Sequence, residues 1–201
     1  MLKRSVFVAL ASLFSFFVLS VSILKASEIH YIYSKPANFE IDKTGAERLR
    51  YDMSFALYPG SIAPNNPLWN VKVGRDKLWL LVTTDPTKKS ELNLLMGEKR
   101  LSSASALFLN NQTDLGISVL TKSEKYLENA FNPEASPDLL FKIANSAIFH
   151  RQIIEDILTI APEQARPMIV STLDYSKRIY KESARLLTEK GKVPPKNPLD
   201  E

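Results

Sequence analysis

A residue followed directly by proline marks four places where a helical apolar pattern begins. These pairs are Asn66-Pro67, Asp85-Pro86, Ser136-Pro137 and Ala161-Pro162. Asn, Asp and Ser side chains accept hydrogen bonds from the free backbone N–H groups of a first helical turn, and proline fits the first helical position. The pattern therefore predicts a succession of helices joined by short turns.

Apolar residues recur at helical spacing after each of these starts. The predicted helices start at Pro67 and Pro86 and then cover about 113–131, 137–160 and 161–190, the last of these kinked or delayed by Pro167. The apolar positions of the first helix are Leu68, Val71, Leu78, Leu81 and Val82. Short connections favour antiparallel neighbours, so the fold class is all-α, a bundle of four to five antiparallel helices after an N-terminal signal-anchor helix.

The N-terminus has the charge and hydropathy of an export signal. Lys3 and Arg4 precede an uncharged apolar run, residues 5–24, which is long enough to span a bilayer. We expect an uncleaved anchor that holds the rest of the chain outside the cytoplasm, because flanking basic residues stay cytoplasmic. The alternative is a cleaved signal peptide, which would make the protein secreted or periplasmic.

Four regions follow from these patterns. Residues 1–27 are a signal-anchor or signal peptide, and residues 28–57 are a leader or linker. Residues 58–190 form the helical bundle domain. Residues 191–201 are rich in proline and polar residues, which predicts a disordered tail.

Charge and composition exclude several functions. The chain has no cysteine, so disulfides, thiol catalysis and thiolate metal sites are excluded. Its net charge is +4, and residues 1–27 contribute three of those charges through basic residues without acids, which leaves +1 for the remainder. A nearly neutral body is a poor match for nucleic acid, which requires concentrated Lys and Arg. No nucleic-acid partner is expected.

No constellation of residues predicts catalysis, a cofactor or a metal ion. His150 lies between Ala147 and Ile154 on an apolar helix face, where a half-buried histidine bonded to a neighbouring helix is expected. A pH-sensing role is the sharper alternative. Glu124 and Glu128, one turn apart, are interpreted as solvated surface. The chain is therefore predicted not to be an enzyme.

The proline-rich segment before the first helix combines two kinds of local structure. Residues 58–64 are expected to be a rigid extended crossing segment, because each proline restricts its own φ and the residue before it. Trp69 either packs this segment onto the bundle or is displayed to a partner or membrane. The candidate structural or interaction residues are Pro59, Gly60, Pro64, Pro67, Leu68, Trp69, Asp85, Pro86, His150 and Pro162.

Three segments resemble a known family. Residues 58–72 read YPGSIAPNNPLWNVK, residues 83–92 read TTDPTKKSEL with a Lys-Arg-Leu run at 99–101, and residues 147–150 and 160–165 read AIFH and IAPEQA. Together they resemble the bacterial exported domain of unknown function 5667, over about residues 55–185. The resemblance implies an extracytoplasmic helical domain, often beside a membrane segment, and carries over no catalytic residue.

Two functions fit these expectations. The first is a membrane-tethered extracytoplasmic helical interaction or sensor module, held in the membrane by residues 5–24 and able to bind a protein partner on its helical faces. The second is a soluble periplasmic stress- or metal-responsive, chaperone-like helical protein.

Overall fold

The computed structural model describes residues 7, 10–19, 66 and 68–199, which belong to two units that are described separately. In the first unit, residues 7 and 10–19 are helical. No helix among the described residues is both long and apolar enough to cross a membrane. The leader at 28–57 and the candidate residues Pro59, Gly60, Pro64 and Pro67 lie outside the described residues.

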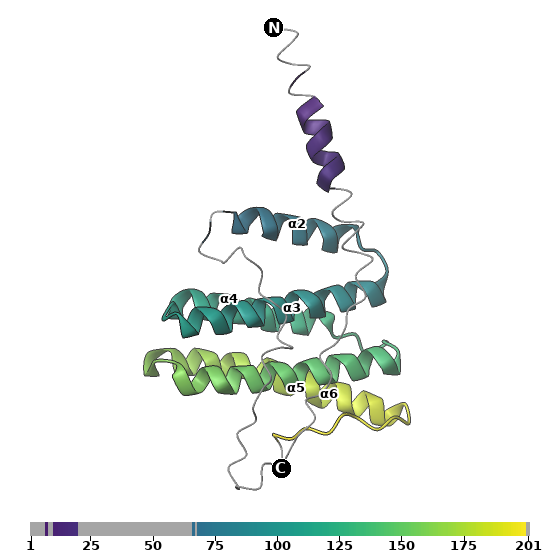
Figure 1. Cartoon of the computed structure of the whole chain (residues 1–201). Coiled ribbons are helices and arrows are strands. Elements are labelled where there is room, and N and C mark those ends of the chain that lie inside the picture. Colours follow the sequence, from purple (N-terminus) through teal and green to yellow (C-terminus); the bar gives the residue numbers. More distant parts are fainter. Residues whose placement is uncertain (1–6, 8–9, 20–65, 67, 200–201) are drawn as a thin grey trace, which may run out of the picture. The chain divides into compact units, whose positions relative to one another are not determined.

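The second unit is helical wherever secondary structure is assigned, which confirms the predicted all-α class for the described residues (Figure 1). Its elements are α2 (Trp69–Val82), α3 (Pro86–Leu109), α4 (Thr113–Ala130), α5 (Pro137–Ile160), η2 (Glu163–Ala165) and α6 (Arg166–Glu189). The observed bounds of α4 and α5 lie within a residue of the predicted ones.

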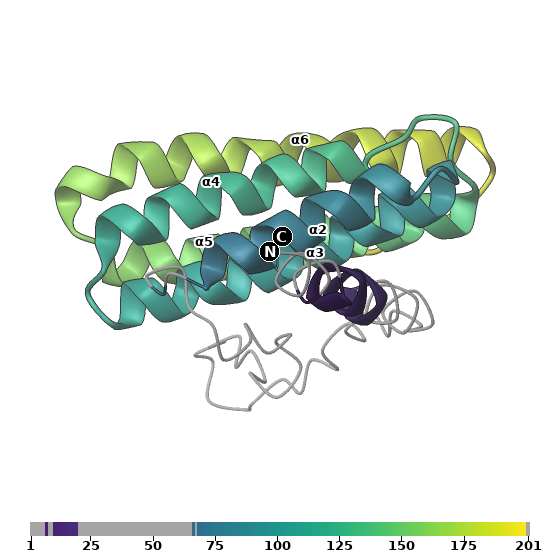
Figure 2. The same cartoon turned by 90° about the horizontal axis from the view of Figure 1, so that it is seen from above.

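Two helical hairpins stack on each other. One pairs α3 with α4 and the other pairs α5 with α6, and α3 packs on α5 while α4 packs on α6 (Figures 1 and 2). Neighbours within a hairpin are antiparallel because a short turn joins them. Lys142 near the start of α5 reaches Glu91 near the start of α3 at 2.8 Å, so helices related by stacking run parallel. The α2 helix adds a further layer over α3.

The core between the hairpins forms two clusters of buried apolar side chains. The first cluster includes one residue from each of the four long helices: Leu101, Leu120, Ile154 and Ile169. The second cluster contains Leu94, Leu127, Leu140, Ile143, Ile179 and Leu187. Each cluster draws on α3, α4, α5 and α6, so the four helices share one interior.

The predicted helix starts are confirmed for α3 and α5. The Asp85 carboxylate accepts a hydrogen bond from the Lys88 backbone N–H at 2.7 Å, and the Ser136 hydroxyl accepts one from Leu139 N–H at 3.3 Å. At α2, the Asn66 side chain accepts from Leu68 N–H at 2.9 Å, and the helix itself begins at Trp69.

Pro167 delays the last long helix, one of the two predicted outcomes. After Pro162 the chain forms the short η2 turn, and α6 then begins at Arg166 with Pro167 in its first turn, where no backbone bond is lost. The helix ends as predicted before Gly191, whose φ of 71° lies in the left-handed region that glycine adopts without strain.

Residues 191–199, for which the sequence predicts disorder, have defined contacts. The Tyr180 hydroxyl donates to the Pro195 carbonyl at 2.9 Å, and Arg151 donates to the Leu199 carbonyl at 3.0 Å. Pro195 is buried, and Asn197 is 7% exposed. The Tyr180 hydroxyl of α6 and the Arg151 guanidinium of α5 therefore hold residues 191–199 against these two helices.

Replacing Asp85 with alanine is expected to lower the free energy of unfolding by about 1 kcal/mol, because the first turn of α3 loses its side-chain acceptor. Chemical denaturation measures the change. Asp85→Asn, which keeps an acceptor oxygen, serves as the control and should lose much less. Equal losses in both variants would mean that the hydrogen bond to Lys88 contributes nothing.

Candidate functional site

A carboxylate and a histidine form a pair in the core. Glu124 lies on α4 and His150 on α5, both side chains are fully buried, and Glu124 Oε1 lies 2.5 Å from His150 Nδ1. The interpretation of Glu124 as solvated surface is wrong, whereas Glu128 is exposed and pairs with Arg178. Leu120 and Leu127 are four residues before and three after Glu124, and both are fully buried. Residues three and four apart share one face of a helix, so the two leucines indicated that Glu124 also faces the core.

A second buried carboxylate lies in the same interior. Glu98 on α3 is 3% exposed, and its Oε1 accepts a hydrogen bond from the Ser146 hydroxyl on α5 at 2.9 Å. Ser146 is one turn before His150, so two carboxylates from different helices bond to neighbouring positions of α5. This polar layer, formed by Glu98, Glu124, Ser146 and His150, links three helices.

Gly97 brings α3 close to this layer. A Cβ atom there would lie 3.3 Å from the Ser123 carbonyl, 3.5 Å from the Leu127 backbone nitrogen and 3.5 Å from His150 Cε1. The first distance is tighter than ordinary packing allows, so a side chain would push against both the α4 backbone and the imidazole. The glycine therefore permits the close approach that encloses the pair.

Three buried polar atoms in this interior have no hydrogen-bond partner among the described residues. They are Glu124 Oε2, His150 Nε2 and the hydroxyl of Ser183 on α6. Buried polar groups are nearly always bonded, and an unpaired one costs about 1–3 kcal/mol. Each partner of the pair therefore has a second polar atom that no described protein group bonds.

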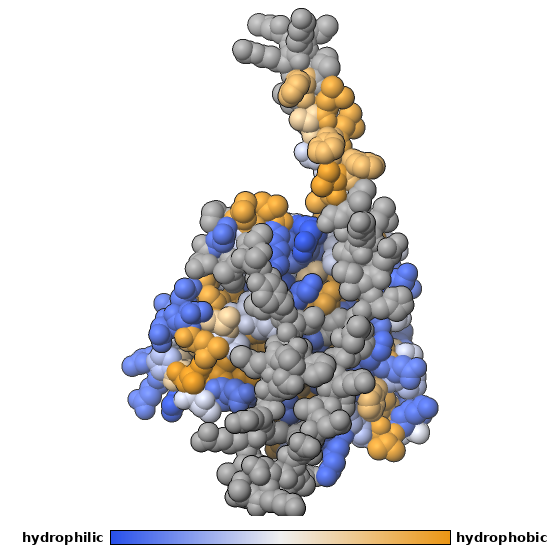
Figure 3. Space-filling view, viewed as in Figure 1, coloured by the Kyte–Doolittle hydropathy of each residue, from blue (hydrophilic) through white to orange (hydrophobic). Residues whose placement is uncertain are grey.

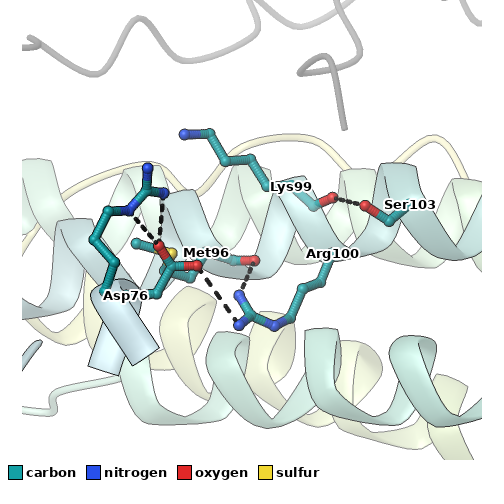
Figure 4. Close-up of polar contacts among 6 residues, drawn as sticks. Asp76, Met96, Lys99, Arg100 and Ser103 are labelled. Atoms are coloured by element: carbon teal, nitrogen blue, oxygen red, sulfur yellow. Dashed lines mark hydrogen bonds and ion pairs between the residues drawn. The ribbon is translucent and has the colours of Figure 1, made fainter. Parts of the chain in front are cut away.

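A second charged contact joins α2 to α3 (Figure 4). Asp76 of α2 is 2% exposed and its carboxylate lies between two guanidinium groups: Arg75 at 2.8 Å and Arg100 of α3 at 3.8 Å. Arg100 also donates to the Met96 carbonyl at 3.4 Å and stacks over the Tyr126 ring of α4 at 4.3 Å. Arg100 thus connects α2 to the α3–α4 hairpin.

Lysine side chains surround this contact. Burial lowers the pKa of Lys72 and Lys99, and the nearby Asp76 carboxylate opposes that lowering in both. The Lys72 ammonium also lies 4.7 Å from the centre of the Trp69 ring. Trp69 is half-buried and lines a small cavity together with Met96 and Lys99 of α3, so one side of its ring is covered by the domain.

The predicted candidate residues do not gather in one place. Leu68 is 56% exposed, next to Trp69 at the start of α2. Asp85 and Pro86 begin α3, and Pro162 precedes η2, so these residues shape helix starts. His150 alone lies in the core. Sequence reasoning missed its partner Glu124, as well as Glu98 and Asp76.

Two further features of the described part of the chain bear on metal and ligand binding. No group of three or more His, Asp or Glu residues there is placed to hold a metal ion. A cavity of about 450 Å³ opens between α5 and α6 and is lined by Arg151, Lys177 and Lys181. Neither Glu124 nor His150 lines it.

The fold and its interior define a small helical domain of stacked hairpins with a buried polar layer. Residues 61–164 match the model of the family described as Domain of unknown function (DUF5667), and the chain belongs to this family. The match spans α2 to α5 and confirms the resemblance seen in the sequence. Comparisons with curated proteins and with solved structures give no match.

Proposed function

We propose that this chain is a membrane-tethered extracytoplasmic helical interaction or sensor module without catalytic activity. The observation that carries the proposal is the fully buried Glu124–His150 pair. It links α4 to α5 in the interior. A pair in this position couples the packing of α4 to that of α5, and such coupling is what an interaction or sensor module requires.

Burying two ionisable groups has an energetic cost that argues for a role beyond stability. Removing charges from water costs several kcal/mol per ion, and apolar replacements of such pairs are often neutral or stabilising. A further buried carboxylate, Glu98 of α3, bonds to Ser146, one turn before His150 on α5.

The N-terminal sequence supports the tether. Lys3 and Arg4 followed by the uncharged run at 5–24 have the order of a signal-anchor, and that order would place residues 28–201 outside the cytoplasm.

The interaction role is tested by a pull-down with the full chain as bait. Specific co-purification of a protein partner is expected, and it should be lost in the Glu124→Gln/His150→Gln double variant, because the pair joins α4 to α5. Glu128→Gln, an exposed change on the same helix, is the control and should keep the partner. Recovery of only background proteins by the wild-type chain would refute the proposal.

The tether is tested on the mature protein. An intact Met1 in a membrane fraction that resists carbonate extraction is the expected result. A mature N-terminus near Glu28 in a soluble fraction would instead support the alternative hypothesis, a soluble periplasmic protein. If zinc or copper then left its melting temperature unchanged, a metal-responsive role would be excluded.

A further inference from the structure

The α2 helix buries an acidic residue and exposes several apolar ones. Asp76 is buried against α3, whereas three apolar residues of the helix and Leu68 just before it are exposed. Other apolar residues of α2, Trp69 among them, are half-buried. Leu68, Val71, Leu81 and Val82 are 56%, 69%, 77% and 54% exposed, respectively. Figure 3 shows an apolar patch at one end of α2, at the position that Figure 1 gives this helix, with hydrophilic surface beside it. A surface helix normally turns such residues toward the core.

These residues form one continuous stripe. Val71, Leu78 and Leu81 are separated by seven and three residues, which places them on one side of a helix. Gly74 lies between them, and a Cβ atom there would have no neighbour within 4 Å. The stripe therefore has open space beside Gly74, while Leu78 within it is half-buried. We call it the α2 outer stripe, comprising Leu68, Val71, Gly74, Leu78, Leu81 and Val82.

The charges beside the α2 outer stripe are all positive. Lys77 is exposed on one side of it, and Arg75, with a side chain 40% exposed, is bonded to the Asp76 carboxylate at 2.8 Å. The helix contains one acidic residue, Asp76, which points inward to Arg100. The outer side of α2 thus combines apolar and cationic groups without a carboxylate. Long basic side chains flanking an apolar stripe are characteristic of helices that lie in a membrane interface.

We propose that the α2 outer stripe lies on an anionic phospholipid surface. The inference rests on the proposed tether, because the apolar run at 5–24 would hold the domain near a bilayer and 44 residues separate Leu24 from Trp69. The apolar side chains enter the boundary between headgroups and acyl chains, and Lys77 reaches the lipid phosphates.

A second copy of the chain is the competing occupant, and the charges disfavour it. A symmetric contact would place the same stripe on both subunits. Lys77 and Arg75 of each copy would then approach the same residues of the other, and the outer side of α2 has no acidic residue to pair with them. Like charges brought together this way oppose association.

The absence of native cysteine allows a position-specific test on the full chain. Val71→Cys, in the α2 outer stripe, is labelled with an environment-sensitive fluorophore. Val170→Cys is the matched control, since it replaces another exposed valine on a different helix, α6. Each protein is reconstituted in vesicles of phosphatidylcholine with or without phosphatidylglycerol.

The label at position 71 is expected to shift to the blue and to be quenched by lipid-borne quenchers in the anionic vesicles, while the label at position 170 remains in water. Lys77→Gln should lower the membrane partition coefficient measured at position 71 by about fivefold, because one cation near the surface is lost. Equal water exposure at both positions would overturn the inference. So would cysteine cross-linking between copies at position 71 that does not depend on lipid, since it would assign the stripe to a dimer.

Flotation of the unlabelled full chain separates this inference from the proposed function. If the chain floats with vesicles while position 71 stays in water, the tether is supported and the α2 contact is refuted. If the chain does not float, the tether is refuted, and the α2 contact is then tested by adding anionic vesicles to the soluble protein.

Discussion

Replacing His150 with leucine is expected to lower the free energy of unfolding by about 3–5 kcal/mol, because the Glu124 carboxylate then lies in the core without its partner. Both side chains are completely buried, so water cannot replace the lost hydrogen bond without opening the interior. Urea denaturation followed by circular dichroism at neutral pH measures the loss.

The partner variant isolates the cause. Glu124→Met combined with His150→Leu removes both polar groups at similar volume, and it is expected to regain most of the stability lost in His150→Leu. Glu128→Met, on the exposed side of α4, is the matched single change and should cost less than about 1 kcal/mol. If the double variant were as unstable as His150→Leu, packing at position 150 rather than the unpaired carboxylate would be responsible.

Replacing Gly97 with leucine is expected to cost about 3 kcal/mol, because its side chain would have to enter the space between the α4 backbone and the His150 ring. A Cβ atom alone already lies 3.3 Å from the Ser123 carbonyl, and a peptide backbone cannot turn aside as a side chain can. Thermal and urea denaturation measure this loss.

Gly74→Leu provides the matched control within the same protein. Its Cβ atom meets nothing within 4 Å, so the gain in helix propensity should leave stability unchanged or raise it by about 0.5–1 kcal/mol. Similar losses at both glycines would contradict the close approach of α3 to α4 and would indicate a general effect of the substitution.

Local signals in the sequence predicted the helices well. Asp85 and Ser136 begin α3 and α5 as expected, since a side-chain acceptor followed by proline acts within one turn of chain. Pro167 was predicted to kink or delay its helix, and the structure shows the delay. These features depend on residues that are neighbours in sequence, so periodicity and cap chemistry were sufficient.

Long-range pairing was not predictable in the same way. Glu124 and His150 are separated by 26 residues and belong to different hairpins. Glutamate is usually exposed, and only the buried leucines around it indicated otherwise. The orientation of α2 was missed for a related reason. Its apolar residues are at helical spacing. In the structure, however, Asp76 lies against Arg100 of α3, and Val71 and Leu81 face the solvent.

The boundary of the family match has a consequence for how this protein must be handled. The match ends at residue 164, two residues before α6 begins. Yet α6 supplies Ile169, Leu173, Ile179 and Leu187 to the interior, and each is at most 4% exposed. A fragment cut at the family boundary would uncover the apolar faces of α4 and α5 and would aggregate. The cooperative folding unit is therefore larger than the segment by which its family is recognised.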